Sequence, residues 1–201
     1  MIAVIDYGMG NIGSVSKALE SLGGDVKVTQ APSDLKKAEK IVLPGVGAFE
    51  DSMDALAELK LIGPLKEEIA SGKIYLGICL GLELLFEKSE EGGSREGLGI
   101  LKGDVVRFSG ASLKVPHIGW NQVNIKNNKC PLFKGIDNDT FFYFVHSYYV
   151  RPESPDISAA TTEYGDDFTS MVWKDNIYAV QFHPEKSQDA GLKFLNSFMR
   201  L

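Results

Sequence analysis

The sequence has 201 residues, enough for one domain, spanning 1–201, with a sizeable hydrophobic core. Hydrophobic residues make up 44% and charged residues 24%, both ordinary for a globular protein. The net charge of −6 leaves no basic footprint for nucleic acid or membrane lipid, and no uncharged apolar run is long enough to span a bilayer. No cluster of residues has metal-ligand spacing, so we predict neither a metal nor another cofactor.

The N-terminal half alternates between short apolar strands and helices. We expect helices near residues 11–22, 49–59 and 62–71. The chain reaches a charge at Asp6, so its start is typical of a first strand rather than a signal peptide. Alternation of this kind predicts an α/β fold with a mainly parallel sheet covered by helices. The expected strands are 2–5, 26–28, 41–43 and 74–78.

From about residue 98 the pattern changes to short β-prone runs, which predict antiparallel strands. A closing helix is expected at 189–200, and the Gly/Glu/Ser stretch 88–97 is predicted to be a mobile loop. The expected strands lie near 100–107, 121–125, 141–150, 157–162, 169–174 and 177–182.

The segment Gly77-Ile78-Cys79-Leu80-Gly81 is typical of a nucleophile elbow built around a thiol. The apolar strand before it and a helix expected over 80–87 place Cys79 on a sharp turn with its side chain exposed. The two glycines leave room where the backbone must pack closely, and the helix N-terminus favours thiolate over thiol. Alone, the motif is equally compatible with a buried cysteine that acts as a small hydrophobe.

His183 follows the last expected strand, and Pro184 stops that strand there. In extended geometry the side chains of His183 and Glu185 point the same way. Glu185 then accepts from one ring nitrogen while the other faces Cys79, which completes a Cys–His–Glu triad. The alternative for Glu185 is a solvated loop carboxylate.

A Gly-rich turn, Pro44-Gly45-Val46-Gly47, follows the strand at 41–43. Such a turn can present backbone N–H groups to an oxyanion, with the N–H of Leu80 as the second donor, although most turns of this composition have no such role. A Gly-x-Gly-x-x-Gly pattern at 8–13 has the local context of a dinucleotide loop, but no acidic residue closes the second strand. We therefore favour a surface turn there, whose Asn11 could serve a partner.

The two cysteines, Cys79 and Cys130, are too few for a disulfide scaffold, and a catalytic thiol must be reduced. Both points favour the cytoplasm. His117 and His146 sit beside aromatic residues, and we favour satisfied structural histidines over catalytic ones.

Together, the Gly-rich turn, the elbow and the His-Pro-Glu run resemble the signature of class I (triad-type) glutamine amidotransferases, over essentially the whole chain. Three longer strings narrow the resemblance to the glutaminase subunits of imidazole glycerol phosphate synthases. The resemblance implies a flavodoxin-like, mostly parallel sheet with helices on both faces and an added antiparallel region in the C-terminal half. The three strings are 6–11, 116–121 and 143–148.

The resemblance also implies a mechanism and a partner. Cys79 attacks the side-chain amide of glutamine, His183 carries the proton, and the N–H groups of Val46 and Leu80 hold the oxyanion. The ammonia passes to a separate (β/α)8 cyclase subunit, which makes imidazole glycerol phosphate and aminoimidazole carboxamide ribotide in histidine biosynthesis. A closed route is needed because ammonia in neutral water becomes ammonium, which is not a nucleophile.

Several further roles are implied only by the resemblance. Gly45 and Gly47 would line the substrate site, and the backbone of His146-Ser147-Tyr148 would hold the glutamine carboxylate. Family members commonly carry glutamine four residues after the nucleophile, but this chain has Glu83, whose carboxylate can accept from the substrate ammonium and cannot donate. A first-turn helix acid is the competing interpretation of Glu83. The residues implied to face the cyclase are Asn11, Trp120, Asn121, Tyr143 and Lys186.

Two other functions stay open. The triad does not distinguish this glutaminase from that of another amidotransferase, or from an independent γ-glutamyl hydrolase of the same fold. A catalytically silent interaction module is the third possibility. It predicts that Cys79 is not captured by a glutamine-like electrophile.

Overall fold

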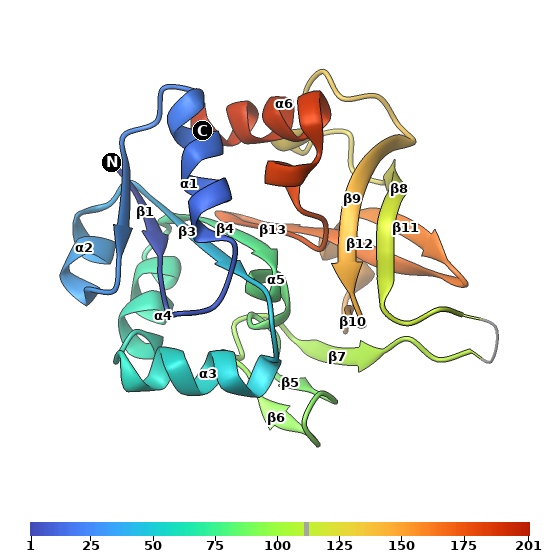
Figure 1. Ribbon diagram of the computed structural model, residues 1–201, viewed down its shortest axis with the longest axis horizontal. Helices are drawn as coiled ribbons and strands as arrows, with labels where there is room; N and C mark the ends of the chain where they lie inside the picture. Colours follow the sequence, from blue (N-terminus) through green and yellow to red (C-terminus); the bar gives the residue numbers. More distant parts are fainter. Residues whose placement is uncertain (111–112) are drawn as a thin grey trace.

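The computed structural model describes residues 1–110 and 113–201. Within them, the main sheet has nine strands in the order β2-β1-β3-β4-β13-β12-β11-β8-β9 (Figure 1). Its first five strands are parallel, in the flavodoxin-like order that the fold prediction implied. They are β2 (Val26–Thr29), β1 (Ile2–Ile5), β3 (Lys40–Gly45), β4 (Ile74–Cys79) and β13 (Ile177–Val180).

The C-terminal half extends this sheet with antiparallel strands, as the change of pattern after residue 98 predicted. These are β12 (Asp166–Lys174), β11 (Ser158–Tyr164), β8 (His117–Ile125) and β9 (Thr140–His146). A smaller sheet in the described residues has the order β10-β7-β5-β6. Its strands are β10 (Tyr148–Pro152), β7 (Gly103–Arg107), β5 (Lys88–Ser89) and β6 (Arg95–Glu96).

Helices cover both faces of the parallel part (Figure 1). In β3, Val42 packs into a core shared with α1 and α6, whereas Ile41 and Leu43 pack into a second core with α2, α3 and α4. Alternate residues of a strand point to opposite faces, so a sheet buried on both faces reads as a continuous apolar run. The helices are α1 (Ile12–Ser21), α2 (Pro32–Lys37), α3 (Phe49–Glu58), α4 (Ile62–Ala70), α5 (Leu80–Glu83) and α6 (Gln188–Met199), with 3₁₀ turns η1 (Pro131–Phe133), η2 (Pro155–Ile157) and η3 (Pro184–Lys186).

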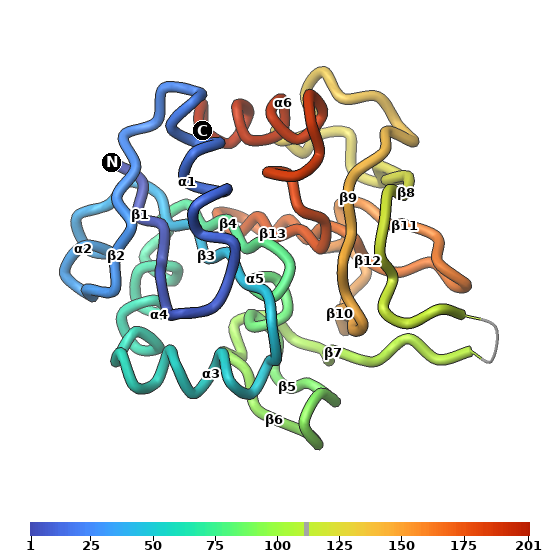
Figure 2. The backbone as a smooth tube through the Cα atoms, viewed as in Figure 1, coloured from blue at the N-terminus to red at the C-terminus, as the bar shows by residue number. Residues whose placement is uncertain are grey.

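The predicted helices at 11–22, 49–59, 62–71 and 189–200 are confirmed to within a few residues. The six-residue α2 was not predicted, although Pro32 at its start is a usual helix-opening residue. The Gly-rich turn connects β3 to α3, and both ends of the chain lie on the same side of the molecule (Figure 2). None of the helices in the described residues has the length and apolar character needed to cross a membrane.

The helix predicted over 80–87 is wrong in length, because α5 ends at Glu83. The carbonyls of Leu84 and Leu85 accept from the N–H groups of Leu98 and Ile100, at 2.8 and 2.9 Å, rather than from the next helical turn. A contact with a distant segment therefore replaces the helical hydrogen bonds that the local sequence favours.

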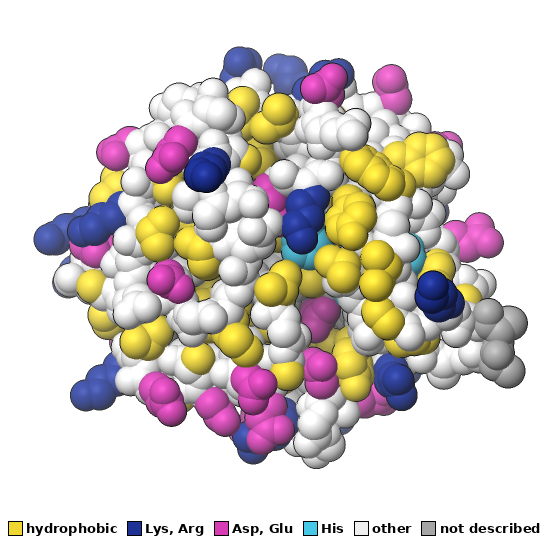
Figure 3. Space-filling view, viewed as in Figure 1, with side chains coloured by type: hydrophobic (Ala, Val, Ile, Leu, Met, Phe, Trp, Pro, Cys, Tyr) yellow, Lys and Arg dark blue, Asp and Glu magenta, His cyan; other side chains and the backbone are white. Residues whose placement is uncertain are grey.

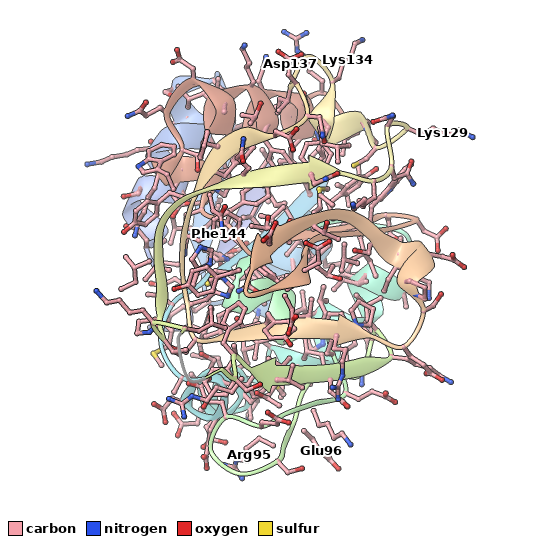
Figure 4. The ribbon with its side chains drawn as sticks, turned by 90° about the vertical axis from the view of Figure 1, so that its right-hand side faces the viewer. Arg95, Glu96, Lys129, Lys134, Asp137 and Phe144 are labelled. Carbon is pink, nitrogen blue, oxygen red and sulfur yellow. The ribbon has the colours of Figure 1, made fainter. Side chains whose placement is uncertain are left out.

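The stretch 88–97, predicted to be a mobile loop, contains a short hairpin of β5 and β6. Arg95 forms an ion pair with Glu50 on α3, and Oε2 of Glu91 accepts from the N–H of Phe49 at 2.9 Å. Figure 4 shows Arg95 and Glu96 at the lower end of the molecule, where this hairpin projects. Its two ties to α3 fix a segment whose composition alone indicated a loop.

Candidate active site

Cys79 is the last residue of β4 and adopts a backbone conformation that L-residues rarely take, with φ 54° and ψ −104°. This strained turn is the expected elbow geometry, and its cost is met by the surrounding packing. A Cβ at Gly81 would lie 1.9 Å from the carbonyl oxygen of Leu43, and one at Gly77 would lie 2.4 Å from that of Gly81. The close packing that the flanking glycines predicted is therefore present on both sides of the nucleophile.

Cys79 is 5% exposed, so the exposed side chain expected at the elbow is wrong. Its sulfur lies 3.8 Å from Nε2 of Gln181 and 3.9 Å from the carbonyl oxygen of Val145. Burial raises the pKa of this thiol well above its usual value, and the carboxylates of Glu83 and Glu185 raise it further. The N-terminus of α5 was expected to favour the thiolate. Desolvation raises the pKa of Cys79 by more than the N–H of Leu80, the first residue of α5, lowers it.

His183 lies beyond the end of β13, which pairs in parallel with β4 through Val180 and Ile78. Its Nδ1 donates to Oε1 of Glu185 at 2.9 Å, and the two side chains are 1% and 0% exposed. Glu185 is thus no solvated loop carboxylate. The pair forms although Glu185 sits in the 3₁₀ turn η3 and not in the extended geometry expected for it.

The backbone around His183 is anchored on β9. The N–H of His183 donates to the carbonyl of Tyr143 at 2.9 Å, and Oγ of Ser187 donates to the carbonyl of His183 at 2.7 Å. The N–H of Tyr143 donates in turn to Oγ of Ser187 at 3.0 Å. In the described residues, Nε2 of His183 is buried with no hydrogen-bond partner, Cys79 included. This free nitrogen, just beyond the strand that pairs with that of the nucleophile, can take a proton when substrate tightens the site.

A cavity of about 160 Å³ opens on Cys79. At about 30 Å³ for a water molecule, it has room for about five waters, the size of a small amino acid. Nearly all of the predicted oxyanion and substrate residues line it. The lining residues are Val46, Gly47, Cys79, Leu80, Glu83, Glu91, Val145, His146, Ser147 and Tyr148.

Three predicted site residues do not line this cavity: the catalytic residues His183 and Glu185, and Gly45, which pairs directly with Cys79 across β3 and β4. A Cβ there would lie 2.2 Å from the hydroxyl of Tyr7 and 2.8 Å from Cβ of Leu80. The Gly-rich turn therefore starts beside the nucleophile. Gly10, in the loop weighed as a dinucleotide fingerprint, packs against Pro44 and Gly45, which favours the structural turn over a nucleotide site.

Two acidic side chains share the cavity wall. Glu83 is 4% exposed and accepts from Nε2 of Gln181 at 2.8 Å. Burial, opposed in part by the hydrogen bond from Gln181 and reinforced by the nearby Glu91, raises the pKa of Glu83 to about 8. Neither Glu91 nor Gln181 was predicted from the sequence to belong to the site. Gln181 lies two residues before His183, so strand alternation was a usable signal, whereas nothing in the local sequence indicated Glu91.

His117 and His146 form a buried hydrogen-bonded chain, which supports the structural role favoured for them. Nδ1 of His146 donates to the carbonyl of Tyr148 at 2.7 Å, so its Nε2 accepts from Nδ1 of His117 at 2.9 Å. Nε2 of His117 then accepts from Nδ2 of Asn121 at 3.2 Å, and its ring stacks on Tyr164 with centroids 4.0 Å apart. Burial lowers the pKa of His117 to about 4 and that of His146 to about 3, so both rings are neutral.

The residues implied to face a partner gather around the triad. Nδ2 of Asn11 donates to Oε1 of Glu185 at 3.4 Å, and Nζ of Lys186 lies 5.8 Å from the ring centroid of Tyr143. Trp120 packs edge-on against Tyr143, with centroids 6.1 Å apart, and is 45% exposed. Figure 3 shows, between α1 and β9, part of a buried histidine beneath a Lys or Arg and beside several hydrophobic side chains.

The same surface carries two more exposed apolar residues, Ile118 at 58% and Phe141 at 52%. Both belong to the paired strands β8 and β9, whose opposite face buries Phe144 in the core. Figure 4 labels Phe144, which lies on the inner side of these strands. Exposed aromatic and aliphatic side chains gathered in this way mark an interaction surface.

Within residues 1–110 and 113–201, no three His, Cys, Asp or Glu side chains are grouped as metal ligands. Both cysteines in this part of the chain are free thiols.

Comparisons with known proteins agree with this geometry. The family model described as "Glutamine amidotransferase class-I" matches residues 3–200. The "Imidazole glycerol phosphate synthase subunit HisH" of Syntrophotalea carbinolica is 51% identical, covering 98% of each chain. The "Imidazole glycerol phosphate synthase subunit HisH 1" of Campylobacter jejuni is 49% identical over 100% of each.

Solved structures share the fold at lower identity. A chain in the structure of PurLQS from Thermotoga maritima superposes with a TM-score of 0.78 at 20% identity, covering 99% of this chain and 97% of that one. The Trypanosoma brucei CTPS glutaminase domain with bound acivicin gives 0.66 at 17%, covering 99% and 93%. The chain thus belongs to the class I glutamine amidotransferase family and, within it, to the HisH subunits of imidazole glycerol phosphate synthase.

Proposed function

We propose that this chain is the glutaminase subunit of an imidazole glycerol phosphate synthase, acting in histidine biosynthesis. The observation that carries the proposal is the buried His183–Glu185 pair, which follows the strand paired with that of Cys79, together with the amino-acid-sized cavity that opens on Cys79. Relatives that are about 50% identical over nearly the whole chain carry the name of that synthase subunit.

The reaction divides into two displacements at one carbon. Sγ of Cys79 bonds to the side-chain amide carbon of glutamine, and the thiol proton passes to Nε2 of His183. The same nitrogen then protonates the leaving nitrogen, which departs as ammonia and leaves a glutamyl thioester. Water, deprotonated by His183, attacks the thioester and releases glutamate and the thiol. Glu185 holds the ring in the tautomer that both steps require.

The raised pKa of Cys79 bears on the first displacement. Because the resting thiol is protonated, attack must be coupled to proton transfer to His183 rather than start from a standing thiolate. A protonated thiol does not react with other electrophiles in the absence of substrate. The site is thereby quiet until glutamine closes the distance between sulfur and imidazole.

The cavity wall supplies the other contacts. We propose that the N–H groups of Val46 and Leu80 hold the tetrahedral oxyanion, with Gly45 and Gly47 letting the turn approach the substrate. The backbone of 146–148 would receive the α-carboxylate of glutamine. Glu91, the second carboxylate in this wall, would receive its α-ammonium.

The product ammonia would pass to a (β/α)8 cyclase subunit in a heterodimer. The surface formed by Asn11, Trp120, Asn121, Tyr143 and Lys186 supports this partner, because it joins exposed aromatic side chains to the carboxylate of the triad. We further propose that residues 1–201 act as one glutamine amidotransferase domain, since one sheet runs from β2 to β9. The need for a reduced Cys79 supports a cytoplasmic location.

The test is glutamate release from glutamine by the chain alone and with the cyclase subunit and its ribonucleotide substrate. We expect low activity alone and a large increase in the complex. The variant Cys79→Ala should abolish activity, and Cys130→Ala, which removes the other buried thiol, should retain it. Full activity alone, unchanged by the cyclase, would identify an independent γ-glutamyl hydrolase. No activity, with no capture of Cys79 by a glutamine-like electrophile, would identify a silent interaction module.

A further inference from the structure

Glu83 is a carboxyl group in the wall of the substrate cavity without a cation to balance it. Its side chain is 4% exposed, and no Lys, Arg or His of the described residues forms a salt bridge with it. The protein hydrogen bond described to it comes from the neutral amide of Gln181, which reaches Oε1 at 2.8 Å. A buried carboxylate needs a cation or several donors, and a single amide supplies neither.

The groups around Glu83 make the charged form less favourable still. The Cys79 thiol and the tyrosine hydroxyls beside Glu83 are neutral or, when they ionise, negatively charged, and Glu91 is a second acid. Burial lowers the pKa of His146 to about 3, so that ring carries no positive charge at neutral pH. The titratable groups that face Glu83, from each element packed against it, are Tyr7, Cys79, Glu91, His146 and Tyr148.

We propose that Glu83 works as a neutral carboxylic acid that donates a hydrogen bond to the bound glutamine, so that its ionisation weakens substrate binding. This inference rests on the proposed glutaminase function. The neutral acid has one O–H donor and keeps acceptor capacity. Oε1 already accepts from Gln181, which leaves the protonated Oε2 for an oxygen of the substrate. The group then offers the same pair of functions, one donor and one acceptor, as a side-chain amide.

The proposal predicts a pH dependence of glutamine binding opposite to that of the obvious alternative. A charged Glu83 that held the α-ammonium of glutamine would bind substrate more tightly as the pH rises. If a neutral Glu83 instead donates a hydrogen bond to glutamine, binding becomes weaker as the pH rises, because Glu83 then ionises. Burial raises the pKa of Glu83 to about 8, so the neutral fraction falls from about nine-tenths at pH 7 to about one-tenth at pH 9. The apparent Kd scales inversely with that fraction, which predicts roughly tenfold weaker binding.

The first arm of the test measures glutamine binding without turnover. The complex with the cyclase subunit carries Cys79→Ala, and calorimetry gives the Kd of glutamine from pH 6.5 to pH 9. We expect Kd to rise roughly tenfold between pH 7 and pH 9. Adding Glu83→Gln should keep the affinity of pH 7 and remove this rise. Adding Glu87→Gln, which changes an exposed acid four residues further along the chain, should leave the rise unchanged.

The second arm observes the carboxyl group directly. The chain is labelled with ¹³C at glutamate carboxyls, and the resonance that Glu83→Gln removes is followed in a pH titration. A midpoint near 8 supports the proposal, and a midpoint near the ordinary 4.3 of glutamate overturns it.

The two arms separate the inference from the function on which it rests. A wild-type complex that neither binds nor hydrolyses glutamine at any pH would refute the proposed function, whatever the titration shows. A complex that binds glutamine equally well at pH 7 and pH 9, or more tightly at pH 9, would overturn the role of Glu83 while leaving the function in place.

Discussion

Gly81→Ala tests whether the elbow is held by direct backbone contact. The added Cβ would lie 1.9 Å from the carbonyl oxygen of Leu43 and 3.0 Å from its carbonyl carbon. Real Cβ contacts essentially never fall below 3.0 Å, so the two backbones must separate by at least 1.1 Å, the difference between 3.0 and 1.9. Leu43 belongs to β3, in the middle of the sheet, and it pairs with Gly77 on β4.

The size of the effect follows from what must move. Overpacking that side chains can absorb costs about 1–3 kcal/mol, and here two backbone segments must shift instead. We therefore expect a loss of at least ~3 kcal/mol in the free energy of unfolding. For a chain of this length the loss lowers Tm by roughly 6–12 °C. The same shift moves Pro44 and Gly45, so glutaminase activity should fall as well.

The assay is urea denaturation followed by circular dichroism, with Gly13→Ala as the matched control. Gly13 also lies in a helix, and a Cβ there would meet nothing within 4 Å. Replacing that glycine should raise the free energy of unfolding by roughly 0.5–1 kcal/mol, because alanine favours the helix. A Gly81→Ala protein as stable as the parent, with normal activity, would refute the packing argument for the elbow.

Three other predictions concern the triad, the buried histidines and the surface. His183→Asn should lower kcat in the cyclase complex by roughly 10²–10⁴, with glutamine still bound by calorimetry, because it removes the general base; retained kcat would assign the proton transfer to another group. Burial lowers the pKa of His117 to about 4, against about 6.5 when unfolded, so the stability it contributes above pH 6.5 is lost as the pH falls toward 4. In urea titrations between pH 6.5 and 4.5, His117→Phe should reduce the slope of unfolding free energy by up to ~1.4 kcal/mol per pH unit, and an unchanged slope would mean that the ring is charged in the folded protein. Trp120→Ala should weaken cyclase binding by about 2 kcal/mol or more, roughly thirtyfold, and equal affinity would place the partner on another face.

The identity of the nucleophile and of its base could be predicted from the sequence because both depend on short-range constraints. Glycines at 77 and 81 and a proline at 184 fix the local course of the backbone, so the side chains between them have few directions available. The β–α alternation likewise determined the parallel half of the sheet, since the spacing of apolar residues in each strand and helix indicates which of its faces is buried.

Tertiary structure alone decided how the site is charged and what completes its wall. Glu91 reaches the cavity because its hairpin is tied to α3 across 42 positions of sequence, and Gln181 meets Glu83 across 98. No local pattern encodes such contacts. The raised pKa values of Cys79 and Glu83 arise mainly from desolvation, which depends on every atom packed around them and, at Cys79, outweighs the opposing N–H of Leu80.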